Sequence, residues 1–193
     1  MQIVSTRRLN YYFYISGHNR MHPMRDFDKY RVGVDKELIE LASCEENRLI
    51  ATCMARQCIH FIDIISRKLD PEVLNTPEFI EALRQLIIRK RRPRVRIIVF
   101  EPDIIVRHGH LLLEFAGRHS SFIEMRKASA EFHGYNEFLL VADATAYLHR
   151  NNASRHEATA NFNDRRQSKL YLDDFLTMWI QSSPDQNLRP LKL

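Results

Sequence analysis

The residues whose types and spacing could do chemistry lie in one stretch, GYNEFLLVADATAYLHRNNASRHEATANFND, residues 134–164. Its apolar run, Phe138 to Ala142, ends directly at the acid Asp143, and amides stand before the run at Asn136 and after it at Asn161. Side-chain amides beside a buried strand can donate hydrogen bonds to an anionic ligand. An amide is a poor nucleophile, because it has no basic lone pair at neutral pH. The stretch therefore has the outline of a catalytic motif without the catalytic groups.

This arrangement resembles the phospholipase D superfamily. The superfamily's signature is a histidine, any residue, a lysine, four residues and an aspartate on a buried strand, followed later by an asparagine. When the acid is aligned on Asp143, Asn136 takes the place of the histidine and Phe138 that of the lysine. Asn161 falls near the place of the family's asparagine. As an arrangement of elements, the resemblance covers residues 44–182.

The resemblance also implies what the chain lacks. Enzymes of the superfamily attack a phosphodiester with one histidine, and a second motif copy supplies the histidine that protonates the leaving group. Lysines and asparagines from both copies hold the phosphate oxygens. This chain shows one copy, without the histidine and the lysine. The resemblance thus implies a domain that does not hydrolyse phosphodiesters by this mechanism and that pairs with a second copy across the motif edge.

A closer likeness is to an uncharacterised bacterial domain of this shape, which occurs alone or after an acetyltransferase domain. The shared pieces are LDPEVLNTPEFIEAL, VRIIVFEP, GHLLLEFA, FLLVAD and the ending DQNLRPLKL. This likeness implies an acetyltransferase or another protein as a partner, and it implies no activity.

The remaining sequence predicts the elements that position this stretch. We expect an α/β fold in which a mixed β-sheet is flanked by helices on both faces, like one half of a phospholipase D-like fold. Helices are predicted for Asp35–Gln57 with a break near Ser43, from Thr76 to Arg89, within GHLLLEFAGRH and for Ser168–Gln181. Strands are predicted for Ile59–Ile65, VRIIVF, SSFIEMRK and three segments of the motif stretch. The segment EPDIIVRHGH is predicted to be a loop on the rim of any pocket.

Length and composition indicate one globular domain. The chain has 193 residues, of which 45% are hydrophobic and 27% are charged, enough to bury a core. We predict a single domain over residues 31–193. Residues 1–30 are predicted to be an appendage, either a start-site artefact with internal starts at Met21 and Met24, or an added strand or contact with a second chain.

Cysteine usage and hydropathy bear on the compartment. The three cysteines, Cys44, Cys53 and Cys58, are odd in number and close together, which argues against a disulfide framework and for small buried residues in a reducing compartment. Neither a secretion signal nor an apolar window long enough to cross a membrane is evident. We therefore expect a cytoplasmic protein with no membrane contact.

The strongest charge feature is the cluster Arg89–Arg96, RKRRPRVR. Cations at the end of a helix stabilise the helix macrodipole and keep the surface soluble. The alternative is that Arg96 and its neighbours contact the phosphates of a nucleic acid or of another anionic ligand. No aromatic residues interleave the cluster, as a stacking platform for single strands would need. The formal net charge of +5 is compatible with either interpretation.

Histidines offer the remaining candidates for chemistry. His110 is expected to cap or pack at a helix start. His133 lies on the loop before the motif strand, and His156 lies near the Asn161 loop. Both are interpreted as surface or hydrogen-bonded histidines, with a place facing the motif cleft as the alternative for His156. We expect no metal site and no cofactor, because His108 and His110 lack the further converging ligands that zinc needs. Asp63, inside a predicted strand, is interpreted as a solvent-facing or strand-end acid, with a place near a pocket mouth as the alternative.

Three hypotheses follow. The preferred one is a non-catalytic binding or regulatory domain, dimeric, with Asn136, Asp143, Asn161, His110, His156 and Arg96 as candidate ligand-binding residues. The second is a protein that binds nucleic acid or a phosphate ligand through the Arg89–Arg96 cluster. The third is a cryptic phosphodiesterase that uses His110, His133 or His156.

Overall fold

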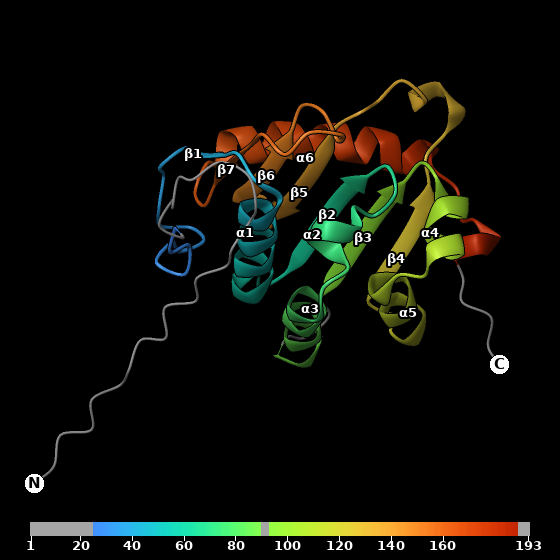
Figure 1. Ribbon diagram of the computed structural model, residues 1–193, viewed down its shortest axis with the longest axis horizontal. Helices are drawn as coiled ribbons and strands as arrows, with labels where there is room; N and C mark the ends of the chain where they lie inside the picture. Colours follow the sequence, from blue (N-terminus) through green and yellow to red (C-terminus); the bar gives the residue numbers. More distant parts are fainter. Residues whose placement is uncertain (1–24, 90–92, 189–193) are drawn as a thin grey trace, which may run out of the picture.

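A seven-stranded mixed sheet forms the centre of the molecule (Figure 1). The computed structural model describes residues 25–89 and 93–188. The sheet order is β1-β7-β6-β5-β2-β3-β4, in which β2, β3 and β4 run parallel and the other neighbours run antiparallel. The strands are β1 (Ile39–Leu41), β2 (Phe61–Ser66), β3 (Arg94–Val99), β4 (Ile123–Lys127), β5 (Phe138–Ala142), β6 (Ala146–Arg150) and β7 (Ala158–Asn161).

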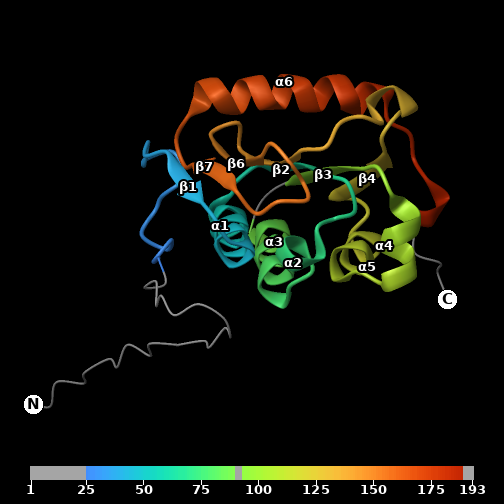
Figure 2. The ribbon, with the colours of Figure 1, turned by 45° about the horizontal axis from the view of Figure 1, so that its top comes forward.

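Helices cover both faces of the sheet, as predicted. One face carries α1 (Cys44–Gln57), α2 (Pro71–Leu74), α3 (Pro77–Arg89), α4 (Pro102–His108) and α5 (Leu111–Arg118). The long helix α6 (Arg165–Gln181) lies across the other face (Figure 2). The main core fills the first face, and a smaller apolar cluster of β2, β3, β5 and β6 side chains packs beneath α6.

The start of α1 differs from the prediction. The segment before it forms β1, which pairs antiparallel with β7 from Ile39↔Ala160 to Leu41↔Ala158. A capping box then opens the helix, because the Ser43 side chain accepts the Glu46 backbone N–H while the Glu46 carboxylate accepts the Ser43 N–H. The prediction of a helix from Asp35 was wrong, since the few apolar residues before Ser43 fit a strand period as well as a helical one.

The segment EPDIIVRHGH also differs from the prediction, because most of it forms α4 rather than a loop. Pro102 stands at the first helical position, where its missing N–H costs nothing. The helix is seven residues long, too short for a helical period to show in the sequence.

Asp63 is fully buried, so the prediction of a solvent-facing acid was wrong. Its two carboxylate oxygens accept Nε and Nη2 of Arg96 at 2.7 Å each, across the register pair that joins β2 to β3. The Arg96 guanidinium also lies 4.7 Å from the ring centre of Phe175 and 5.4 Å from that of Trp179, both on α6. A bidentate ion pair under two aromatic rings satisfies both charges inside the sheet.

The predicted appendage falls partly outside the described residues, which begin at residue 25. Residues 25–30 pack against the domain: Phe27 and Tyr30 are buried, and the Tyr30 ring stacks on Phe162 at 5.4 Å. The Gln57 side chain donates to the Tyr30 carbonyl at 2.8 Å. Packing of the domain thus includes residues before residue 31.

The three cysteines are free thiols; Cys53 and Cys58 are buried and Cys44 is half-buried. In residues 25–89 and 93–188, no helix combines the length and the apolar character needed to cross a bilayer.

Candidate functional site

Asn136 and Asp143 lie at opposite ends of β5. The strand between them is extended and rises roughly 3.3 Å per residue, so the two residues lie about 20 Å apart. Asn161 ends β7 and pairs with Tyr147 at the start of β6, so it lies toward the Asp143 end, two strands away. The structure therefore does not bring Asn136, Asp143 and Asn161 into one cavity.

Asp143 binds backbone of its own chain. Its carboxylate accepts the N–H groups of Ile59, His60 and Phe61 at 2.7, 2.7 and 2.9 Å, as well as the Cys58 thiol at 3.3 Å. Its φ of 53° is left-handed, a conformation that aspartate tolerates better than most residues. Asp143 therefore fixes the start of β2 against the end of β5, and these hydrogen bonds occupy its oxygens.

Asn161 also has internal partners. Its amide nitrogen donates to the Lys36 carbonyl at 3.0 Å, and its oxygen accepts the Asn163 N–H at 2.7 Å. It lines a shallow surface pocket with Lys36, Asn163, Asp164 and Arg165. These bonds shape the turn between β7 and α6.

At the other end of β5, the positions of the family's histidine and lysine are occupied differently. Asn136 is exposed and donates to the Asn152 side chain at 3.2 Å. Phe138 is fully buried, and the Arg150 guanidinium lies 4.5 Å from its ring centre. Arg150 is itself 2% exposed and is paired with Asp70. The Arg150 guanidinium thus lies beside the position of the family's lysine, but Asp70 neutralises its charge and the side chain is buried away from solvent.

His110 caps α5. Its Nδ1 accepts the Leu112 N–H at 3.1 Å, and its Nε2 donates to the Leu69 carbonyl at 2.9 Å. The ring is buried, and burial lowers the pKa of His110, although the Leu69 carbonyl and Asp70 act in the opposite direction. The predicted local role of His110 is confirmed. His133 is exposed in the loop before β5.

A hydrogen-bonded chain that the sequence analysis missed lies on the α6 face. His149 Nε2 is 2.6 Å from the Glu137 carboxylate, and its Nδ1 is 3.0 Å from the Tyr171 hydroxyl. With the proton on Nε2, the histidine donates to Glu137 and accepts from Tyr171. Burial raises the pKa of Tyr171 above its usual range. The sequence contained a signal for this role of His149, because His149 and Tyr147 alternate onto the same face of the β6 strand.

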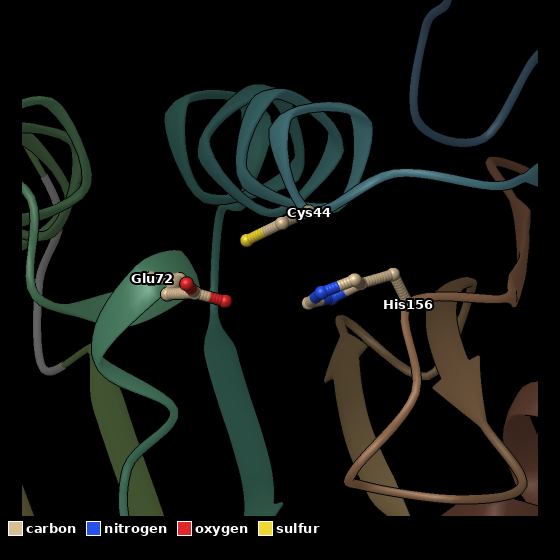
Figure 3. Close-up of side chains that lie close together, drawn as sticks. All are labelled: Cys44, Glu72 and His156. Atoms are coloured by element: carbon tan, nitrogen blue, oxygen red, sulfur yellow. The ribbon is translucent and has the colours of Figure 1, made fainter. Parts of the chain in front are cut away.

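A second missed cluster includes His156. The Cys44 sulfur, a Glu72 oxygen and a His156 nitrogen all lie within 4.8 Å of one another (Figure 3). The three residues come from the start of α1, from α2 and from the β6–β7 loop. They form a set of S, O and N donors that could hold a metal ion, in contrast to our expectation of none.

The sequence was compared with models of known protein families. The family model described as "Domain of unknown function (DUF7931)" matches residues 43–191. The chain belongs to this family. No curated protein sequence matches the DUF7931 chain.

Several solved structures share its fold. The phospholipase D family member Nuc from Salmonella typhimurium aligns at a TM-score of 0.54 and 14% identity, covering 76% of this chain and 97% of Nuc. NucT from Helicobacter pylori aligns at 0.55 and 9% identity, covering 77% and 100%. TrmBL2, an archaeal chromatin protein, aligns at 0.57 and 11% identity, and the match covers 80% of this chain but 56% of TrmBL2. The phospholipase D-like fold is thereby confirmed, whereas fusion to an acetyltransferase stays a prediction.

The His110 cap predicts a pH dependence of stability. Because the folded state lowers the pKa of His110, the unfolded chain takes up a proton first as the pH falls below the ordinary value of 6.5. The free energy of unfolding should therefore be fully present above pH 6.5 and decline below it, by up to about 1.4 kcal/mol per pH unit. Urea unfolding at pH 8 and pH 5.5 measures this difference.

His110→Asn keeps a capping side chain but has no titrating ring. The free energy of unfolding of this variant should therefore fall less between pH 8 and pH 5.5 than that of the wild type. His108→Asn, at an exposed histidine on the preceding helix, is the matched control and should retain the wild-type loss. An equal pH dependence in His110→Asn and wild type would contradict this assignment.

Proposed function

We propose that this chain is a non-catalytic binding domain with a phospholipase D-like fold. The observation that carries the proposal is the buried Phe138 beneath the Arg150–Asp70 pair, at the position that the resemblance assigns to the phosphate-binding lysine. Asn136 stands where the nucleophilic histidine would be. Without the histidine nucleophile, the attack that forms a phosphohistidine cannot occur. Without the lysine, no side chain at that position stabilises the negative charge of the phosphate oxygens.

Four histidines are candidates to replace this mechanism: His110, His133, His149 and His156. Both nitrogens of the buried His110 are engaged, and both nitrogens of His149 have partners within one closed chain. His133 and His156 are exposed on loops. His156 has the Glu72 carboxylate and the Cys44 thiol nearby, so it is the histidine that an activity assay must test. An exposed histidine without a positioned partner acid or base supports at most weak hydrolysis.

A turnover assay tests the absence of catalysis. We expect no hydrolysis of bis(p-nitrophenyl) phosphate or of a plasmid above a protein-free blank, with or without added divalent metal. Turnover that survives purification and disappears in the His133→Ala/His156→Ala double variant would overturn the proposal and support a cryptic phosphodiesterase.

We further propose that the domain acts as a homodimer. The support is the resemblance, in which two half-sites face each other, together with the single motif copy in this chain. The proposed interface with the second copy carries Asn136, just before β5, and Asn152, just after β6. The side chains of these two residues hydrogen-bond to each other.

Sedimentation at micromolar concentration should show twice the chain mass of 22.9 kDa. Asn136→Arg places a bulky charge on the proposed interface and should shift the protein to monomer. Thr177→Arg, at an exposed position of α6, is the control and should remain dimeric. A strict monomer in the wild type would refute dimerisation.

Nucleic-acid binding is a second candidate, favoured by the fold shared with TrmBL2, which is described as showing a novel mode of DNA binding. Arg89 and Arg94 are exposed beside the amino end of β3. Residues 90–92 of the predicted cluster lie outside the described residues. Arg96 does not join this surface, because it is buried and paired with Asp63.

Fluorescence anisotropy with a labelled DNA duplex tests this candidate. We expect salt-sensitive binding, and the Arg89→Glu/Arg94→Glu variant should bind at least about tenfold more weakly. In this variant the slope of log K against log salt concentration should also correspond to about one to two fewer released counterions. Arg166→Glu/Lys169→Glu makes the same change of charge on α6 and should have a smaller effect. Absence of binding at low salt, or equal loss in both variants, would remove this candidate.

A further inference from the structure

We propose that Cys44, Glu72 and His156 form a binding site for a zinc ion. The proposal rests on how three segments that are distant in sequence converge, and it does not depend on the proposed function. The three donor atoms lie within 4.8 Å of one another (Figure 3). Ligand atoms around a tetrahedral zinc ion stand about 3.5 Å apart, given bond lengths of about 2.0–2.3 Å. Closure by about 1 Å, within the reach of side-chain rotation, would complete the site.

The donor types select the metal. Thiolate sulfur and imidazole nitrogen are ligands for zinc and similar borderline ions, whereas magnesium and calcium take oxygen ligands. One cysteine, one histidine and one carboxylate supply three protein ligands. Glu72 and His156 are exposed and Cys44 is half-buried. A fourth position is therefore open to water or to an external ligand, as in zinc sites with three protein ligands.

Buried polar groups hold the three segments together around this site. Asn47, which is fully buried in α1, donates to the His156 carbonyl at 2.8 Å and to the Ser43 carbonyl at 2.7 Å. Arg150 donates to the Arg155 carbonyl at 3.2 Å and pairs with Asp70, the residue before α2. Each donor residue is thus itself anchored from the core or lies within two positions of a residue that is. Such supporting bonds orient metal ligands in known sites.

The electrostatics of the cluster favour a cation. The Glu72 carboxylate lies within 4.8 Å of the Cys44 sulfur, so a bound cation would face two ligands that can carry negative charge. A bound zinc ion would deprotonate the thiol and neutralise the carboxylate.

The location fits ligand binding. The start of α1 and the segment after β2 lie at the carboxyl end of β2, where α/β sheets bind ligands. The β6–β7 loop that carries His156 is tied to Asn136, whose carbonyl accepts the Ala153 N–H at 2.8 Å. The zinc site thereby adjoins the end of β5 that the resemblance assigns to catalysis.

Metal titration of the full chain tests the proposal. The protein is stripped with a chelator, desalted, and titrated with zinc in competition with a chromophoric chelator. We expect one zinc ion per chain and a higher unfolding temperature with zinc. Cobalt in place of zinc should give a sulfur-to-cobalt charge-transfer band that Cys44→Ser abolishes.

Glu72→Gln and His156→Gln should each weaken zinc binding about 100-fold or more, since even supporting residues of zinc sites are worth 10–100-fold. Matched controls are Glu78→Gln, at an exposed acid that begins α3, His133→Gln, at an exposed loop histidine, and Cys53→Ser. Far-ultraviolet circular dichroism and the urea midpoint without metal verify that each variant folds. If Cys44→Ser does not fold, the His156→Gln variant still tests the site, because His156 lies on an exposed loop.

Three results would overturn the proposal: no zinc binding at submillimolar metal, a cobalt spectrum without the sulfur band, or equal weakening by His133→Gln and His156→Gln.

Discussion

The ion pair between Arg150 and Asp70 is the constraint on which the site depends. Arg150 ends β6 inside the protein, so its charge requires a partner there, and Asp70 supplies it from the segment before α2. The same guanidinium lies over Phe138 and donates to the carbonyl of Arg155 in the β6–β7 loop. One buried cation therefore lies where the resemblance places the family's lysine, and it also positions the segments that carry Glu72 and His156. Loss of pairing would leave an uncompensated buried charge, which is among the costliest changes a core can suffer.

Local signals explain how much of the fold could be predicted. The β-branched runs of β2 and β3 and the helix start at Pro77 are set by nearby residues, and the structure confirms them. β1 escaped prediction because a three-residue strand is specified by its partner β7 and not by its own sequence. Asp63 was misjudged for a related reason, since its burial depends on Arg96 in the neighbouring strand.

The candidate site was harder to predict than the fold, because it is made of contacts between distant segments. The opposite placement of Asn136 and Asp143 follows from the length of an extended strand, and the sequence contained that information. The convergence of Cys44, Glu72 and His156 did not follow from any spacing, since each residue is carried by a different element. The chain Glu137–His149–Tyr171 likewise needs α6 to be placed across the sheet before it exists.

The segment after α6 has a consequence for self-association. Ser183 and Lys127 exchange backbone hydrogen bonds of 2.8 and 3.0 Å, and Lys127 also lies 3.8 Å from the Asp185 carboxylate. This contact covers one end of β4, the outermost strand on its side of the sheet. An uncovered outer strand offers unpaired N–H and C=O groups to any other extended chain, the route by which sheets grow into aggregates. At Lys127, the C-terminal segment thus satisfies backbone groups that would otherwise be open to strand addition.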